Sequence, residues 1–102
     1  MDYVALLTFR SSVPAGERDA ALMRRAAWHY PENMDVVAEY WPMTDTVQVV
    51  IIFSTDDPAA LMELEFEWND VFDIAISPAV SAEAGLAIGP EVFGRLSRMQ
   101  PS

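Results

Sequence analysis

Hydrophobic and polar residues follow one another in a pattern that predicts four strands and two helices in the order β-α-β-β-α-β. The first strand is expected at Tyr3–Arg10, where apolar β-forming residues run up to a loop rich in Ser, Pro and Gly. The segment Glu17–Tyr30, rich in Ala, Arg, Leu and Met and closed by Pro31, predicts the first helix. The other expected elements are strands at Asp35–Pro42 and Thr46–Ser54, a helix at Pro58–Asn69 and a strand at Val71–Ser77.

This order is the split βαβ pattern, which predicts an α+β fold of the ferredoxin-like type. We expect a four-stranded antiparallel sheet with both helices on one face, and a short hairpin connection at Met43–Asp45. Asp57 suits the N-cap of the second helix and Pro58 its first position. Residues 1–80 are expected to form this domain, with residues 81–102 as a helical tail packed on it and Pro90 in the first turn of a helix.

Two of the strands are apolar on both faces. The strand at Tyr3–Arg10 has Tyr3, Ala5, Leu7 and Phe9 on one face and Val4, Leu6, Thr8 and Arg10 on the other. The strand at Thr46–Ser54 behaves in the same way. Because two helices cover only one face of a sheet, the second face needs another cover, and we expect a homodimer formed through it. The alternative is that the tail folds across the sheet as a lid.

Composition narrows the class of protein. At 102 residues the chain is the size of one domain, and 52% of its residues are hydrophobic. Sixteen acidic residues against six arginines give a net charge of −10, which disfavours nucleic acid and anionic membranes as partners. No cysteine is present, and no apolar run is long enough to span a membrane, so we expect a cytoplasmic protein. We expect no cofactor and no classical metal site, because one His and no Cys supply too few ligands, and a carboxylate-only metal site is the alternative.

Several short motifs resemble those of a known family. They are TDDP at Thr55–Pro58, the W-x-D pair Trp68 and Asp70, and the turn Pro78–Val80. With the element order and the doubly apolar strands, they resemble the dimeric α+β-barrel superfamily and, within it, the family called domain of unknown function 3303. The resemblance implies a dimeric α+β barrel. It also opens the possibility of a cofactor-independent monooxygenase, since the superfamily includes such enzymes, but it identifies no catalytic residue here.

Glu65 is the first candidate functional residue. A helical wheel places it near the centre of an apolar arc formed by Leu61, Met62, Leu64, Phe66 and Trp68. A carboxylate facing a sheet or cavity has to be paired, hydrogen-bonded or protonated. Two alternatives to a functional role remain. The helix lies at the sheet edge, or Glu65 forms a structural ion pair with Arg10 or an arginine of the first helix.

His29, the only histidine, is a candidate general base, or alternatively a cap of the first helix. The complete expected pocket comprises Glu65, His29, Trp68, Asn69, Trp41, Glu39 and Arg10. It is expected to lie between helices and sheet and to bind or transform a small apolar or aromatic molecule. The alternative function is a non-catalytic homodimerisation or protein-interaction module.

Overall fold

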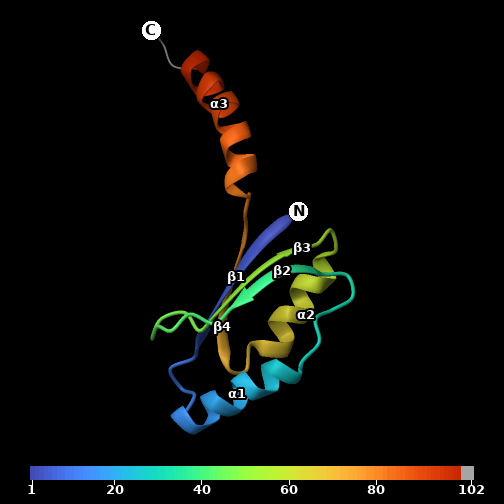
Figure 1. Cartoon of the computed structure of the whole chain (residues 1–102), viewed down its shortest axis with the longest axis vertical. Coiled ribbons are helices and arrows are strands. Elements are labelled where there is room, and N and C mark those ends of the chain that lie inside the picture. Colours follow the sequence, from blue (N-terminus) through green and yellow to red (C-terminus); the bar gives the residue numbers. More distant parts are fainter. Residues whose placement is uncertain (100–102) are drawn as a thin grey trace.

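A computed structural model describes residues 1–99 and shows the predicted α+β order followed by a third helix (Figure 1). The strands are β1 (Asp2–Phe9), β2 (Asp35–Tyr40), β3 (Val49–Ser54) and β4 (Phe72–Pro78), and the helices are α1 (Ala15–Ala27), α2 (Pro58–Trp68) and α3 (Ala82–Met99). All neighbouring strands are antiparallel, in the order β2-β3-β1-β4. The predicted fold class is therefore confirmed.

Strand alternation decides which residues form the core. The side chains of Ala5 and Leu7 in β1 and of Val49, Ile51 and Phe53 in β3 are fully buried beneath α1 and α2. The helices add Ala21, Ala60, Leu64 and Trp68 to the buried set. One face of the sheet is thus packed against the two helices, as predicted.

Two boundaries differ from the prediction. The first helix ends at Ala27 instead of Tyr30, because Trp28 takes an extended conformation and its ring turns inward to pack on Trp68. The connection between β2 and β3 comprises residues 41–48 instead of three residues. Gln48 bonds to β1 instead of β2, donating its backbone N–H to Leu7 and accepting from the N–H of Phe9.

The C-terminal helix stands apart from the sheet (Figure 1). None of the residues of α3 is buried, and the radius of gyration of 17.4 Å exceeds the roughly 13 Å of a compact domain of this length. In the single chain α3 neither packs on the sheet nor covers its open face as a lid. The N–H of Ala79 bonds to the backbone oxygen of Asp2 and is the last backbone hydrogen bond with β1 before the helix. The division at residue 80 stays a prediction, and residues 100–102 lie outside the described residues.

Pro90 lies in the interior of α3, where it interrupts the backbone hydrogen bonding, and not in a first turn as expected. None of the helices within residues 1–99 combines the length and the apolar character that crossing a bilayer requires.

Candidate functional site

A buried ion pair joins α1 to β2. Arg25 donates from Nε to Oε2 of Glu39 at 2.8 Å and from Nη2 to Oε1 at 2.9 Å. The Arg25 side chain is 1% exposed and that of Glu39 is 20% exposed. Glu39 faces the helices because a bulge between Val36 and Ala38 shifts the register of β2 and sets Glu39 opposite the buried Ile51. Glu39 therefore lies on the helix side of the sheet.

Aromatic groups complete this cluster. The Tyr30 hydroxyl donates to Glu39 and accepts from Arg25, and the Trp41 indole N–H donates to Glu39 at 2.7 Å. The Arg25 guanidinium also lies 5.0 Å from the centre of the Trp68 ring. Both oxygens of the Glu39 carboxylate are thus occupied by hydrogen-bond donors, which suits a structural role better than proton transfer.

Trp68 belongs to the core and does not line a pocket. Its side chain is fully buried and packs edge-on against Trp28, at 5.6 Å between ring centres, and beside Phe72 at 5.8 Å. Its indole nitrogen has no hydrogen-bond partner within residues 1–99. A tryptophan held in this way contributes apolar packing to the core.

Glu65 is half-buried at the margin of the stripe that α2 buries. That stripe is Ala60, Leu64 and Trp68, whereas Met62 and Phe66 are exposed, so the helix is rotated relative to the predicted arc. Within residues 1–99 the Glu65 side chain makes no hydrogen bond or ion pair. The proposed central position of Glu65 is therefore wrong.

The arginines considered as partners of Glu65 bind elsewhere. Arg10 donates from Nε to the backbone oxygen of Asn69 at 2.6 Å and approaches Asp73 at 3.8 Å. Asn69 itself is the C-cap of α2. These contacts tie the end of α2 to β1 and β4, and the ion pair expected as the alternative for Glu65 is not formed in the described chain.

His29 borders an open depression between the end of α1 and the outer face of α2. Its volume is about 390 Å³, and its lining residues are Trp28, His29, Pro31, Glu63, Phe66 and Glu67. His29 is exposed and lies beyond the end of the helix, which is capped by the backbone N–H of Trp28. Of the seven expected pocket residues, only His29 lines this depression.

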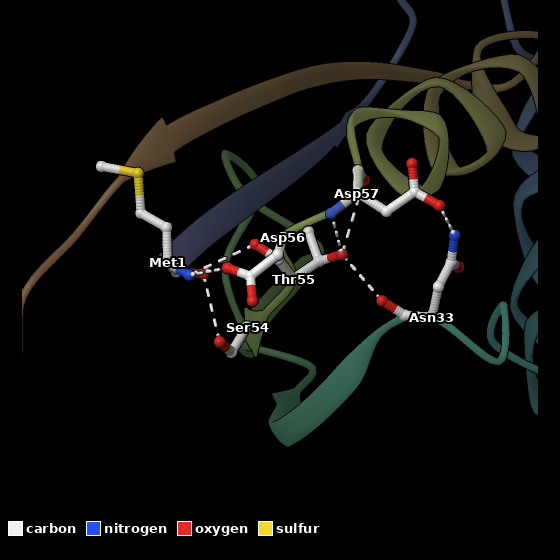
Figure 2. Close-up of polar contacts among 6 residues, drawn as sticks. All are labelled: Met1, Asn33, Ser54, Thr55, Asp56 and Asp57. Carbon is white, nitrogen blue, oxygen red and sulfur yellow. Dashed lines mark hydrogen bonds and ion pairs between the residues drawn. The ribbon is translucent and has the colours of Figure 1, made fainter.

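The TDDP motif forms a polar corner between β3 and α2 (Figure 2). The buried Thr55 donates from Oγ1 to the backbone oxygen of Asn33 at 2.7 Å and accepts from the N–H of Asp57 at 3.1 Å. Asp57 accepts from the N–H of Ala59 at 2.9 Å, which confirms the predicted N-cap. That bond and a second one from the Asn33 amide lower the pKa of Asp57.

The W-x-D motif supplies a second structural contact. Asp70 accepts two hydrogen bonds from Arg24, at 2.9 Å and 3.2 Å, and these bonds lower the pKa of Asp70 and raise that of Arg24. Arg24 also lies over the Trp68 ring, 4.1 Å from its centre. The motif thus links α1 to the end of α2.

Sequence reasoning missed Arg25, Tyr30 and Thr55 as members of polar clusters. Nothing in the sequence around Arg25 indicates that it is buried or paired, because its helix contains several arginines and its neighbours Arg24 and Ala26 are exposed. Thr55 had a detectable signal, since a Thr two residues before an N-cap Asp suits a local side-chain to backbone turn.

Comparison with known proteins agrees with the resemblance seen in the sequence. No curated protein and no solved structure shows significant similarity to the chain. The model of the family DUF3303, a domain of unknown function, matches residues 1–93, which include the ion-pair cluster, the TDDP corner and the W-x-D contact, and the chain therefore belongs to this family.

Proposed function

We propose that this protein forms a homodimer through the open face of the sheet. The function that we propose first is non-catalytic and consists of this self-association. The observation that carries the proposal is the apolar character of that face. In the single chain Leu6 is 37% exposed, Ile52 is 38% exposed and Tyr40 is 64% exposed. Contiguous apolar surfaces of this kind mark interaction sites.

Strand register supports the proposal by gathering these side chains. Leu6 lies opposite Val50 on one side and Ala75 on the other. Ile52 lies opposite Val4 in β1 and Ala38 in β2. The patch therefore crosses all four strands. A face of this shape can pair with its own copy about a two-fold axis, which is the commonest way in which soluble proteins associate.

Light scattering after size exclusion tests the dimer. We expect the full chain to have twice its monomer mass of 11.4 kDa, and Ile52→Glu to shift it to the monomer mass, because a charge would be buried unpaired. Met62→Glu is the matched control, since Met62 is exposed on α2, outside the sheet face, and its variant should stay dimeric. A wild-type mass of 11.4 kDa at micromolar concentration would refute the proposal.

A second candidate function is the binding of a small aromatic cation in the depression beside His29. Trp28 and Phe66 offer ring surfaces there, and Glu63 and Glu67 offer negative charge. Tryptamine is a suitable probe: its titration should shift the His29 ring resonances in NMR spectra, and Phe66→Ala should abolish the shift. Glu91→Ala on α3 is the control. Unchanged His29 resonances at millimolar tryptamine would remove this candidate. The monooxygenase alternative stays a prediction from the resemblance.

A further inference from the structure

The helix α3 lacks, in the single chain, the packing that stabilises most helices in proteins. It spans Ala82–Met99, 18 residues, and in proteins most of the stability of a helix comes from tertiary packing of its apolar face. It also contains Gly85, Gly89, Gly94 and Pro90, which together disfavour the helix by about 6 kcal/mol relative to alanine. Since none of its residues is buried in the single chain, its stability has to come from another surface.

One side of α3 is apolar along its whole length. At 100° per residue the stripe occupies nearly half of the circumference, and Leu86 and Phe93 on it are 79% and 72% exposed. Its members are Leu86, Ile88, Val92, Phe93, Leu96 and Met99. The charged residues of the helix lie on the opposite side. An apolar stripe of this width is typical of a helix that packs on a broad surface.

Charge favours a second copy of this chain as that surface. α3 carries two Arg and two Glu, so its net charge is zero and the whole net charge of −10 lies on the rest of the chain. Contact through α3 therefore adds no net like-charge repulsion to the association of two acidic copies. The helix is the long neutral segment of the chain, and it is joined to the edge strand β4 by only three residues.

The area needed for a stable dimer points the same way. With strands about 4.8 Å apart and about 3.3 Å per residue, the open sheet face projects roughly 400 Å². A standard interface buries about 800 Å² per partner. At 1.5 Å per residue and about 10 Å across, α3 contributes roughly 270 Å² more. The projected area of the sheet face is thus about half of that accessible area, and α3 would enlarge the projected contact surface by roughly two thirds.

We infer that α3 is a dimerisation arm whose apolar stripe packs against a second copy of this chain, beside the paired sheet faces, and that the helix is fully formed only in the dimer. This inference rests on the proposed dimer. In the single chain the arm extends away from its own sheet (Figure 1), which leaves its stripe free to contact a partner copy.

The test uses the full chain and two charge substitutions within α3. Phe93→Glu lies on the stripe, and Ala87→Glu, its matched control, lies on the opposite side of the same helix. Dissociation constants come from analytical ultracentrifugation, and helix formation comes from hydrogen exchange of the α3 amides. We expect Phe93→Glu to weaken the dimer at least tenfold and to remove protection from α3. Ala87→Glu should change the dissociation constant less than threefold.

Comparison with the sheet variant Ile52→Glu distinguishes failure of the dimerisation arm from failure of the proposed dimer. If Ile52→Glu yields monomers while Phe93→Glu leaves both the dissociation constant and α3 protection unchanged, the dimer stands and the arm is refuted. A monomeric wild type with protected α3 amides would refute both, because the helix would then pack on its own chain. If all three variants leave a wild-type dimer unchanged, neither surface holds the dimer and both proposals fail.

Discussion

Breaking the Arg25–Glu39 ion pair is expected to destabilise the fold strongly. Glu39→Gln keeps the shape of the side chain but leaves the guanidinium of Arg25, 1% exposed, without its counter-charge. Removing one partner of a buried pair costs about 3 to 5 kcal/mol. The amide oxygen of glutamine still accepts a hydrogen bond, which favours the lower limit, about 3 kcal/mol. For a domain of this size that corresponds to a fall in Tm of about 12 to 24 °C.

Urea unfolding followed by tryptophan fluorescence, at one fixed protein concentration, measures this loss. Glu63→Gln removes an exposed carboxylate and should stay within about 0.5 kcal/mol of wild type. Arg25→Met and the double variant complete a thermodynamic cycle, in which the double variant should be more stable than the sum of the single losses predicts, by about 1 to 3 kcal/mol. A loss below about 0.5 kcal/mol for Glu39→Gln would show that water reaches the pair, and the reasoning from burial would be wrong.

Three further predictions concern the polar contacts around α2. Thr55→Val leaves the backbone oxygen of Asn33 and the N–H of Asp57 without their partner, so it should cost about 1 to 3 kcal/mol in urea unfolding. Asp70→Asn weakens a largely exposed pair with Arg24 and should cost at most about 1 kcal/mol in the same assay. Because the folded pKa values of Asp57 and Asp70 are lowered, their stabilisation should be complete above the unfolded value of about 3.9 and should be lost as the pH falls below it and through the lower folded pKa values. In the double variant Asp57→Asn/Asp70→Asn the free energy of unfolding should decrease less steeply at acid pH. An unchanged dependence of this free energy on pH would contradict the attribution of the decrease to these two carboxylates.

The sequence predicted those features that depend on local patterns. The strand faces followed from alternation, since Leu7 and Val49 are buried and Leu6 and Ile52 face outward. The N-cap at Asp57 followed from the chemistry of a short carboxylate before a proline. Each of these features is decided within a few residues, so neighbouring side chains contain the necessary information.

Features that depend on distant contacts were not predictable in this way. The bulge in β2 sets Ala38 opposite Ile52 and Glu39 opposite Ile51, although simple counting from Val36 would place them differently. The early end of α1 depends on where the Trp28 ring finds a partner, and that partner, Trp68, lies forty residues further along the chain. Propensity favoured continuing the helix, and tertiary packing ended it.

The contrast between Glu65 and Glu39 shows what limits the prediction of a functional carboxylate. Apolar residues occupy so much of the circumference of α2 that the wheel does not determine which part of the arc meets the sheet. The helix buries Ala60, Leu64 and Trp68, and Glu65 therefore lies at the margin of the buried stripe. Glu39 is the carboxylate that becomes desolvated, and it is tolerated there only because Arg25 approaches from α1. Burial of a charged residue therefore depends on two segments of the chain, one that supplies the charge and one that supplies its partner. Such a residue can be identified only once the packing of the helix on the sheet is known. The packing that buries Glu39 also surrounds its carboxylate with hydrogen-bond donors, so the carboxylate is not available for catalysis.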